Sequence, residues 1–486
     1  MELALKELME ETAAIKDLRD WIEKAEQIGE LKRVNGAHWD VEIGAITDYA
    51  HRKQPVNYSV LFDKIKDYPP GFRVLSNPLG SLKRVAITTG LPMDMTLQSS
   101  VPTWRQRTAN LQMIPPRFVK DGPVMENVLT GDKVNMLMFP TPRWHEEDGG
   151  RYIGTGSVDI TRDPDSDWVN LGVYRCMVKD EKHICFYISP GKNGRIHRQK
   201  YFDRKKPCPV AVSFGHDPLV YMVGGLEVPN GVCEYDYIGG LKGEPVDVIR
   251  GPVTGLPIPA NAEIVIEGFA TEDYVGEEGP FGEWTGYYAS SHRLEPLIKV
   301  EAVYHRNDPI ILGTLVTKPP AEPLFYRTFM RAGLIQEELE KAGIPDVTKV
   351  WCHEAGGSRL LVVVGIKQRY PGHAKQAALV ASQCRAGAYL GRYVVVVDDD
   401  IDVTSLNDVM WAMCTRVDPV KDIDILRRTW SGPLDPIIPV GEKGFNSRAI
   451  FDATRPWEWK EQFPHVAEVS PELHAMVDKK WGKLFE

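Results

Sequence analysis

The sequence contains no long apolar run and no excess of positive charge. None of its hydrophobic stretches approaches the roughly 18 apolar residues that a membrane-spanning helix requires. Its 58 lysines and arginines are outnumbered by 67 aspartates and glutamates, and the net charge of −9 provides no basic footprint for nucleic acid. The N-terminus, MELALKELMEETAAIKDLRD, is too acidic for a secretory signal or an organellar presequence. We therefore expect a cytoplasmic protein that binds neither membrane nor nucleic acid.

Several motifs of common metal and enzyme sites are also missing. The seven cysteines are scattered and never occur as CxxC, which argues for reduced thiols and against a disulfide framework or a zinc cluster. The chain has no G-x-G-x-x-G after a strand pattern, no Walker loop, no G-x-S-x-G and no H-E-x-x-H. Dehydrogenase, NTPase and common hydrolase interpretations therefore lose support.

The length and the changing hydrophobic rhythm predict a multidomain α+β protein. The 486 residues exceed the roughly 250 to 300 at which a single core stops growing. Residues 1–114 predict an N-terminal α/β region, residues 115–320 a β-rich barrel or sandwich, and residues 321–465 an α/β domain with a mostly parallel sheet. Residues 466–486 predict a helical tail. Such a tail can be exchanged between subunits, so we expect a homodimer or a higher homo-oligomer.

Two local patterns predict individual elements, one helix and one strand. Residues 16–34 place apolar side chains at helical spacing, which predicts an amphipathic helix. These side chains are Leu18, Trp21, Ile22, Ala25 and Ile28. The segment VNLGVYRCMV, residues 169–178, predicts one strand that forms a hairpin with HICFYIS around KDEK.

The segment GEEGPFGEWTGYY, residues 276–288, combines carboxylates and aromatic rings in constrained backbone. Glycines and one proline separate Glu278 from Glu283, so a bend can aim both carboxylates into one space. Crowding them against an apolar wall raises at least one pKa, as a general acid at neutral pH requires. The aromatic side chains that indicate a pocket wall are Phe281, Trp284, Tyr287 and Tyr288. The alternative is a pair of exposed loop glutamates.

Arg175 is the single charge on an otherwise apolar face of the strand predicted over residues 169–178. A buried arginine requires anionic partners, and Glu278 or Glu283 can supply them. An arginine that reaches water at the rim of a barrel is the alternative.

Two oxygen donors, Asn170 and Glu234, lie near the ends of predicted strands. A hard cation such as Mg²⁺ or Mn²⁺ uses such groups together with phosphate oxygens. The loop SPGKNGRIHRQKY adds Lys192 and further basic side chains, a composition that suits a phosphate, although a solvated basic turn is the commoner outcome. His197 alone is more often a surface or packing residue than a ligand.

The run VVVVDDDIDVTSLNDV carries four aspartates just beyond a predicted strand. The carboxyl ends of parallel strands gather functional groups in α/β domains, so a metal site is one interpretation. An acidic turn before a helix is the plainer one, because aspartate also caps helices. Similarly, YPGHAKQA begins a helix whose N-terminus can receive an anion, although many helices begin this way without one.

Taken together, these segments resemble the UbiD family of reversible decarboxylases, which use prenylated FMN. The resemblance runs over nearly the whole chain. It is carried by LRDWIEKAEQIGELKRV, NLGVYRCMV, NGVCEYDYIGG, EGPFGEWTGYY and VVVVDDDIDVTSLNDVMWAMCTR. It implies that residues 115–320 form a split β-barrel that binds the flavin, with the active site between this barrel and the C-terminal α/β domain.

The resemblance also implies catalytic roles. In the family an Arg-Glu-Glu network lies beside the prenylated flavin, and Arg175, Glu278 and Glu283 occupy its positions here. Glu283 is then the proton donor to the carbon that loses CO₂, while Arg175 and Glu278 set its pKa and orient the substrate carboxylate. The flavin acts as the electron sink, so the protein supplies position and one proton.

The family binds the flavin phosphate through a divalent metal, usually Mn²⁺ but also Mg²⁺, with K⁺ nearby. The ligands are an asparagine, a histidine and a glutamate, of which Asn170 and Glu234 match. Asn193 stands where relatives often have the histidine, so Asn193 or His197 completes the set, or cofactor binding is weaker. The other cofactor-binding residues that the resemblance implies are Val173, Tyr174, Arg175 and Lys192.

The implied activity is non-oxidative loss of CO₂ from an aromatic, heteroaromatic or α,β-unsaturated carboxylic acid. A flavin prenyltransferase is then the supplier of the cofactor. Two alternatives remain at this point. A flavin-binding redox protein shares the barrel but does not need an arginine and two glutamates beside the ring, and a non-catalytic subunit of a larger carboxylase complex needs no active site.

Overall fold

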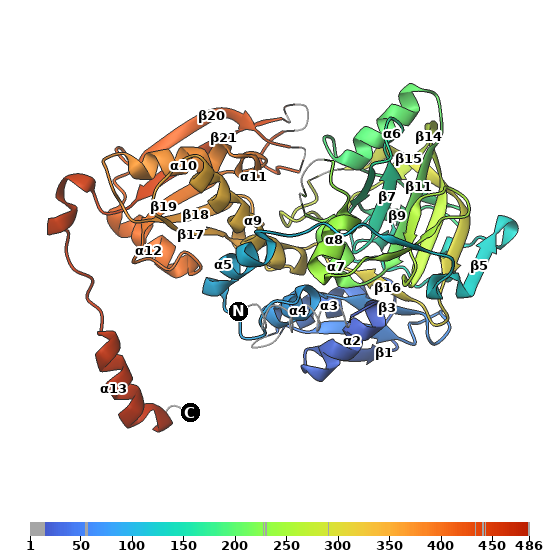
Figure 1. Cartoon of the computed structure of the whole chain (residues 1–486), viewed down its shortest axis with the longest axis horizontal. Coiled ribbons are helices and arrows are strands. Elements are labelled where there is room, and N and C mark those ends of the chain that lie inside the picture. Colours follow the sequence, from blue (N-terminus) through green and yellow to red (C-terminus); the bar gives the residue numbers. More distant parts are fainter. Residues whose placement is uncertain are drawn as a thin grey trace.

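The computed structural model describes residues 15–53, 57–226, 228, 231–289, 291–432, 434–439, 442 and 444–484. The first 14 residues of the acidic N-terminus, on which the expected location rests, lie outside these ranges. Figure 1 shows the N-terminal elements packed below the large central sheet, the C-terminal sheet to the side of both, and the last helix apart from the rest.

The N-terminal region is a small mixed sheet with its helices. Its strands, in spatial order, are β1 (Leu31–Asn35), β2 (Ser59–Asp63), β3 (Arg73–Ser76) and β16 (Ile310–Gly313). Its helices are α2 (Leu18–Gln27), α3 (Glu42–Arg52), α4 (Leu82–Thr89) and α5 (Leu97–Thr108). Strand β16 arrives from the far end of the central domain and pairs in parallel with β3. This pairing ties the two regions together.

Helix α2 has the predicted amphipathic pattern but is shorter than predicted. Asp17 caps it by accepting hydrogen bonds from two backbone N–H groups of the first turn. Trp21 is fully buried, and its Nε1 donates to Thr88 Oγ1 at 2.8 Å, which fixes α2 against α4. The predicted continuation to residue 34 is wrong, because Gly29 adopts the left-handed region with φ 75° and the chain then forms β1.

The central domain is a large antiparallel sheet. In spatial order its strands are β6 (Arg151–Gly154), β9 (Cys176–Val178), β10 (His183–Cys185), β15 (Arg293–His305), β14 (Ile264–Glu278), β11 (Cys208–Gly215), β7 (Val158–Arg162) and β8 (Val169–Gly172), and β5 (Asn127–Thr130) also pairs with β15. The path has two ends, β6 and β8, which do not pair with each other in the described part of the chain. The sheet is therefore a half-barrel.

Smaller elements surround the half-barrel. A three-stranded sheet has the order β13 (Pro257–Pro259), β12 (Asp247–Arg250), β4 (Arg117–Val119). The helices are α6 (Asn193–Asp203), α7 (Pro218–Gly224) and α8 (Glu234–Lys242), with short 3₁₀ helices η1 (Pro123–Glu126), η2 (Gly131–Lys133) and η3 (Met136–Met138).

The predicted single strand over residues 169–178 is broken in the middle. Strand β8 ends at Gly172 and β9 begins at Cys176, so the chain crosses from one end of the half-barrel to the other through Arg175. A Cβ on Gly172 would overlap the Tyr174 ring, which folds back over this glycine. The two-face alternation predicted for this segment was therefore wrong, but the hairpin of β9 with β10 is confirmed.

The C-terminal domain is a five-stranded sheet covered by helices. Its strand order is β17 (Val347–Cys352), β18 (Leu361–Ile366), β19 (Tyr393–Asp398), β21 (Phe445–Ala453), β20 (Ile423–Trp430). Its helices are α9 (Glu322–Lys341), α10 (His373–Gln383), α11 (Arg385–Ala388) and α12 (Leu406–Arg416), with η4 (Glu354–Gly356) and η5 (Trp457–Gln462). The three central strands are parallel as predicted, but both edge strands are antiparallel. Beyond them lie α13 (Pro471–Trp481) and η6 (Gly482–Leu484).

The two faces of the half-barrel belong to two different hydrophobic cores. Along β11, alternate residues Val210, Val212 and Phe214 contribute to one core, whereas Ala211 contributes to the other, as the period of two in a strand requires. The second of these cores continues through α7, α8 and α9 into the C-terminal sheet. The half-barrel and the C-terminal domain are thus joined by continuous apolar packing.

Candidate functional site

Glu278 is the last residue of β14, and the turn that follows brings Glu283 back to the same space. Gly279 has a φ of 87°, a conformation that glycine adopts without cost. The Glu283 N–H donates to the carbonyl oxygen of Tyr287 at 3.1 Å, which closes the turn. Glu278 is fully buried and Glu283 is 7% exposed. The alternative of two exposed loop glutamates is therefore wrong.

Arg175 holds both carboxylates. Its Nε and Nη2 donate to the two oxygens of Glu278 at 2.8 and 2.9 Å, which is the bidentate geometry of a strong guanidinium–carboxylate pair. Its Nη1 forms an ion pair with Glu283 Oε1. The Arg175 side chain is only 8% exposed, so it does not reach water at a barrel rim. Arg175 thus meets two carboxylates that lie 103 and 108 positions away in the sequence, and the three form one buried cluster.

Tyr152 and Arg293 complete this cluster, and neither was predicted. The Tyr152 hydroxyl donates to Glu278 Oε1 at 3.0 Å, and Arg293 Nε lies 3.5 Å from Glu278 Oε2. Arg293 stands directly across from Glu278 in the β14–β15 pair, so a correct register for this hairpin would have found it. Tyr187 packs its ring under both guanidinium groups, with centroids 4.5 Å from Arg175 Cζ and 4.2 Å from Arg293 Cζ.

The charges of the cluster are shifted by burial and by one another. Burial raises the pKa of Glu283 because it disfavours the charged form, and this effect exceeds the opposing attraction of Arg175. Burial opposes the charge of Arg175 as well, but Glu283 and Glu278 outweigh it and raise the pKa of this guanidinium. Glu283 is therefore the member of the cluster whose surroundings favour its protonated form, as a general acid requires.

The cluster borders a cavity of about 180 Å³ between the half-barrel and the C-terminal domain. Its half-barrel wall includes Val173, Tyr174, Arg175 and Glu283. The C-terminal domain contributes three side chains, which are Pro323, Arg327 and Leu434. Two of the four aromatic residues predicted to form a pocket wall, Phe281 and Trp284, line this cavity.

The same prediction was wrong for the other two aromatic side chains. Tyr287 is 63% exposed, and Tyr288 points elsewhere and donates to Asp148 at 3.2 Å. Of the four side chains, the two next to Glu283 in the sequence, Phe281 and Trp284, line the cavity, and the two further along the chain do not.

Two of the predicted metal ligands, Asn170 and Glu234, lie near each other in the fold. The Leu171 N–H donates to Glu234 Oε2 at 2.7 Å, so the strand residue next to Asn170 touches this carboxylate. Burial raises the pKa of Glu234 to about 7. Glu234 has no ion pair among the described residues, and Asn170 is buried with its Nδ2 unpartnered there. A buried carboxylate without a counter-charge suits a cation, to which Asn170 can add its Oδ1. The unsatisfied Asn170 Nδ2 is a donor and suits an anionic oxygen such as that of a phosphate.

The beginning of α6 closes this group. The Gly194 N–H donates to the Tyr174 hydroxyl at 3.2 Å, so Asn193, the first residue of α6, lies beside Tyr174. Lys192 precedes it at an exposed position. In the described ranges no three His, Cys, Asp or Glu side chains form a metal-binding group, as expected for a set that contains two asparagines.

His197 lies deeper in the fold than the sequence indicated. It is fully buried, its Nδ1 shares a hydrogen bond with Thr161 Oγ1 at 3.1 Å, and its ring meets Trp168 edge to face. Burial lowers its pKa. Of the two predictions for His197, a packing residue is therefore confirmed and a surface residue is wrong. Thr161 is paired across the strands with Asn170, so the side chains of these two residues point to the same face of the sheet. His197, which contacts Thr161, therefore lies on the same face as Asn170.

The aspartates after β19 belong to an internal charge network. Arg416 donates to Asp398 Oδ2 at 3.0 Å and to Asp400 Oδ2 at 2.9 Å, and Arg455 also pairs with Asp400. Asp402 accepts the backbone N–H of Thr404 at 2.9 Å. These carboxylates are neutralised or cap the following turn, so the interpretation as an acidic turn holds and the metal interpretation loses support.

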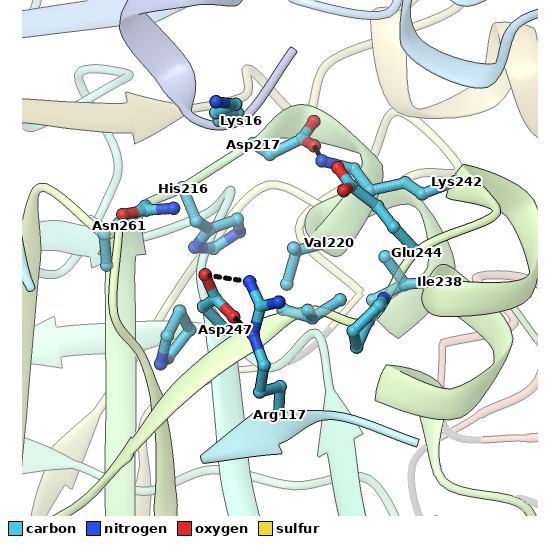
Figure 2. A pocket seen from close by; sticks show the side chains of 14 residues that line it. Lys16, Arg117, His216, Asp217, Val220, Ile238, Lys242, Glu244, Asp247 and Asn261 are labelled. Carbon is cyan, nitrogen blue, oxygen red and sulfur yellow. Dashed lines mark hydrogen bonds and ion pairs between the residues drawn. The ribbon is translucent and has the colours of Figure 1, made fainter. Parts of the chain in front are cut away.

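A second cavity, of about 170 Å³, lies among α7, α8 and β12 (Figure 2). Four of its charged side chains form two pairs: Arg117 Nε lies 2.6 Å from Asp247 Oδ1, and Lys242 Nζ lies 2.6 Å from Asp217 Oδ2. Burial lowers the pKa of His216 to about 3, so this ring is neutral. The cavity contains none of the predicted site residues. We therefore assign the candidate active site to the first cavity.

Comparison with protein families yields three matches along the chain. Residues 22–100 match the 3-octaprenyl-4-hydroxybenzoate carboxy-lyase N-terminal domain, UbiD_N. Residues 117–319 match the Rift-related domain of the same carboxy-lyases, UbiD, and residues 325–453 match their C-terminal domain, UbiD_C. Separately, among the helices of the described ranges, none has the length and apolar character needed to cross a membrane.

Individual relatives are similar over the full length. Pyrrole-2-carboxylic acid decarboxylase of Pseudomonas aeruginosa is 32% identical, over 96% of this chain and 97% of the relative. Vanillic acid decarboxylase of Sedimentibacter hydroxybenzoicus in its open form superposes with a TM-score of 0.84 at 29% identity, over 97% of this chain and 99% of that one.

A third relative has been solved with a flavin. HmfF of Pelotomaculum thermopropionicum, a UbiD-class enzyme in complex with FMN, superposes with a TM-score of 0.84 at 26% identity, over 96% of this chain and 100% of the other. An evolved dimeric form of HmfF in complex with prFMN has a TM-score of 0.80 at 25% identity, with the same shares covered. The similarity thus includes the segments that carry Arg175, Glu278 and Glu283.

Proposed function

The chain belongs to the UbiD family and is a carboxy-lyase, and on this premise we propose that it uses prenylated FMN to decarboxylate an aromatic, heteroaromatic or α,β-unsaturated carboxylic acid. The reaction is non-oxidative and reversible, with CO₂ release as the net direction. The observation that carries the proposal is the buried cluster of Arg175, Glu278 and Glu283 at the edge of a cavity.

Each residue of the cluster has a different role in the proposed reaction. Arg175 is the cation that attracts the substrate carboxylate, and Glu278 with Tyr152 holds its guanidinium in place. Glu283, whose pKa burial raises, donates a proton to the carbon that loses CO₂. Prenylated FMN, when bound, supplies a ring that accepts the electron pair of the broken carbon–carbon bond. Phe281 and Trp284 keep water from this space.

We further propose that Asn170, Asn193 and Glu234 hold Mn²⁺, or Mg²⁺, which binds the phosphate of the cofactor, with K⁺ nearby. The buried and unpaired Glu234 carboxylate supports the metal ion, and the unsatisfied Asn170 Nδ2, which is a donor, supports a phosphate oxygen beside it. Val173 and Tyr174 line the cavity beside the flavin position, and Lys192 stands at the start of α6. Asn193 then contributes an amide oxygen where relatives often have a histidine.

The proposal extends to the organisation of the protein. We propose domain boundaries after residues 114, 320 and 465, a cytoplasmic location, a homodimer or a larger homo-oligomer, and a flavin prenyltransferase as the source of the cofactor. HmfF with bound prFMN in a dimeric form supports the cofactor and is compatible with the oligomer.

The test is Glu283→Gln in protein coexpressed with a flavin prenyltransferase. A screen of aromatic and heteroaromatic acids, beginning with pyrrole-2-carboxylate and vanillate, first identifies a substrate through CO₂ release. We expect E283Q to lower the rate by about 10²- to 10⁴-fold, because a positioned general acid contributes this much. The absorption spectrum and the mass of the bound flavin should be unchanged.

Glu277→Gln is the matched control, because Glu277 is the exposed neighbour of Glu278 on β14. It should keep both flavin and activity. Unchanged CO₂ release in E283Q would reject the role of Glu283. A wild-type protein that binds flavin but releases no CO₂ from any acid would favour a redox protein or a non-catalytic subunit.

A further inference from the structure

Arg327 is a second arginine at the cavity, and the proposed reaction does not use it. It lies one to two turns into α9, on the wall that the C-terminal domain contributes. Its Nε donates to the hydroxyl of the adjacent Tyr326 at 3.2 Å. Within the described ranges it forms no ion pair. The cavity thus has a guanidinium on its C-terminal wall without a carboxylate partner.

The nearest acidic side chain on its own helix is already engaged. Glu322 accepts the Leu79 N–H at 3.1 Å, and its other oxygen accepts the Thr314 hydroxyl. On the opposite side of Arg327, Gly225 leaves room for the guanidinium, since a Cβ there would lie 2.9 Å from Arg327 Nη2. The local packing therefore admits the guanidinium but does not neutralise it.

Arg331, one turn further along α9, shows the contrast. It is buried, whereas Arg327 is half-buried. Arg331 Nη1 donates to the Ala386 carbonyl oxygen at 3.0 Å, and Arg331 does not line the cavity. Arg331 therefore connects α9 to α11 within the fold. Arg327 instead lines the cavity, so its guanidinium N–H groups can donate to a ligand that binds there.

Arg175 forms ion pairs with Glu278 and Glu283. Arg327 has no carboxylate within ion-pair distance in the described ranges. Burial opposes its charge, but Tyr326, Tyr221 and the more distant Glu322 favour this charge and raise its pKa. The planar donors of this half-buried guanidinium match a carboxylate that enters the cavity. Both arginines line this cavity together with apolar and aromatic side chains that include Phe281, Trp284 and Pro323.

We propose that Arg327 is a specificity residue that binds a second carboxylate of the substrate. The substrate class is then an aromatic or heteroaromatic dicarboxylic acid, with the leaving carboxyl group at Arg175 and the retained one at Arg327. This inference rests on the proposed function, because it assigns the orientation of the acid in that reaction. The phosphate of the flavin is the other anion that a guanidinium in this cavity can bind, and the test separates the two.

The test measures binding of matched probes to flavin-loaded protein by calorimetry. The probes are benzene-1,3- and benzene-1,4-dicarboxylate, each compared with its mono-amide, which keeps the shape but removes one charge. We expect the wild type to bind at least one diacid about 10- to 100-fold more tightly than its mono-amide, the range for a charge-assisted hydrogen bond. R327Q should lose this preference and retain its flavin. R327K should recover part of it.

Arg331→Gln is the control on the same helix and should keep the preference. Three results overturn the proposal: no diacid is preferred by the wild type, R327Q weakens diacid and mono-amide equally, or R327Q loses flavin, which assigns Arg327 to the phosphate. Binding does not require turnover. If E283Q and wild type share the preference while no acid loses CO₂, the proposed reaction fails and the assignment of Arg327 stands.

Discussion

Glu283 and Arg175 show how a single residue acquires its chemistry from its surroundings. A free glutamate is ionised at neutral pH. Glu283 is buried beside an apolar wall, which favours its protonated form, while Arg175 prevents the proton from being held too tightly. The balance between these two effects is what makes this carboxyl group suitable for donating a proton.

The raised pKa of Glu283 predicts a pH dependence of catalysis. Because the donor must carry a proton, kcat/KM for decarboxylation should fall as the pH rises through this pKa. The falling limb should lie above the ordinary glutamate value of 4.5. A rate profile between about pH 5 and 9 measures it. A kcat/KM that stays constant, or rises, over this whole range contradicts the assignment of Glu283 as the acid.

Tyr152→Phe tests the support of Glu278. The substitution removes the hydroxyl that donates to Glu278 at 3.0 Å and keeps the ring against Phe281, 4.2 Å away between centroids. We expect kcat to fall by about tenfold, as for one lost hydrogen bond to a charged group, and the pH profile to move. Y274F, on the exposed part of β14, is the control. A purely structural role would change stability but leave the pH profile in place.

Asn193→His restores the residue that relatives often have. If Asn170, Asn193 and Glu234 hold a divalent cation, an imidazole nitrogen should bind Mn²⁺ more tightly than an amide oxygen. We expect a higher manganese content in purified N193H, measured by elemental mass spectrometry, with Q199H on the exposed side of α6 as control. Equal manganese content in N193H and wild type would count against this metal site.

At the scale of elements, the break between β8 and β9 determines the geometry of the site. If the strand had continued, Arg175 would have remained at the edge beside β7. Instead, the Tyr174 ring packs against Gly172 and Gly194, whose missing side chains leave the space it occupies. Gly172→Ala should displace this ring, lower the free energy of unfolding by about 1 to 3 kcal/mol and reduce flavin loading.

Gly333→Ala on α9 is the control for this substitution. Its Cβ would lie nearest to the flexible Arg105 side chain, at 3.2 Å, with Trp104 at an ordinary contact distance of 3.7 Å, and alanine favours a helix. Chemical unfolding and the flavin content per chain are the measurements. If G172A loads flavin as fully as the wild type, the ring of Tyr174 is not needed at this position.

Glu322 connects three elements at the start of α9, and its titration should be visible in stability. Burial raises its pKa to about 7 from the ordinary 4.5. A raised pKa contributes stability that is present below pH 4.5 and is lost as the pH rises through 7. For this fully buried group the loss is on the order of 3 kcal/mol. Glu322→Gln should remove this part of the pH dependence.

Urea unfolding at pH 5 and pH 8 measures the effect. Glu337→Gln, exposed on the same helix, should keep the wild-type difference between the two pH values. Identical pH dependence in E322Q and wild type would show that Glu322 does not bind the extra proton in the folded state.

At the scale of the whole molecule, the tail suggests how chains associate. Helix α13 stands apart from the rest of the chain (Figure 1), and several of its apolar side chains are exposed. These are Leu473, Met476, Val477 and Trp481. Spacings of three and four residues place most of them on one stripe, which is typical of a helix that packs against a partner. A second copy of the chain is the partner we expect.

Deletion of residues 464–486 tests this expectation. The truncated chain should have a lower oligomer mass in native mass spectrometry, because the apolar stripe of α13 no longer bridges two subunits. The double substitution L473D and M476D should act in the same direction without shortening the chain. An unchanged mass in both variants would show that the tail is not an exchanged arm.

Much of the site was predictable because its parts are local. Glu278 and Glu283 lie within one bend whose glycine and proline act on the residues next to them. The helical spacing of α2 and the strand pattern of β14 and β15 are equally local. The edges of the C-terminal sheet were mispredicted because strand direction depends on which strands pair, and hydrophobic spacing alone does not encode this.

The sequence by itself determined the residue types of the cluster, the bend that unites two carboxylates, and the family. The tertiary structure alone decided which charges are balanced. Arg175 and Glu278 are 103 positions apart, Arg293 joins them through the register of one hairpin, and Arg327 reaches the cavity through the packing of the C-terminal domain. Backbone preferences act over a few neighbouring residues, whereas burial and ion pairing depend on segments that only the folded chain brings together.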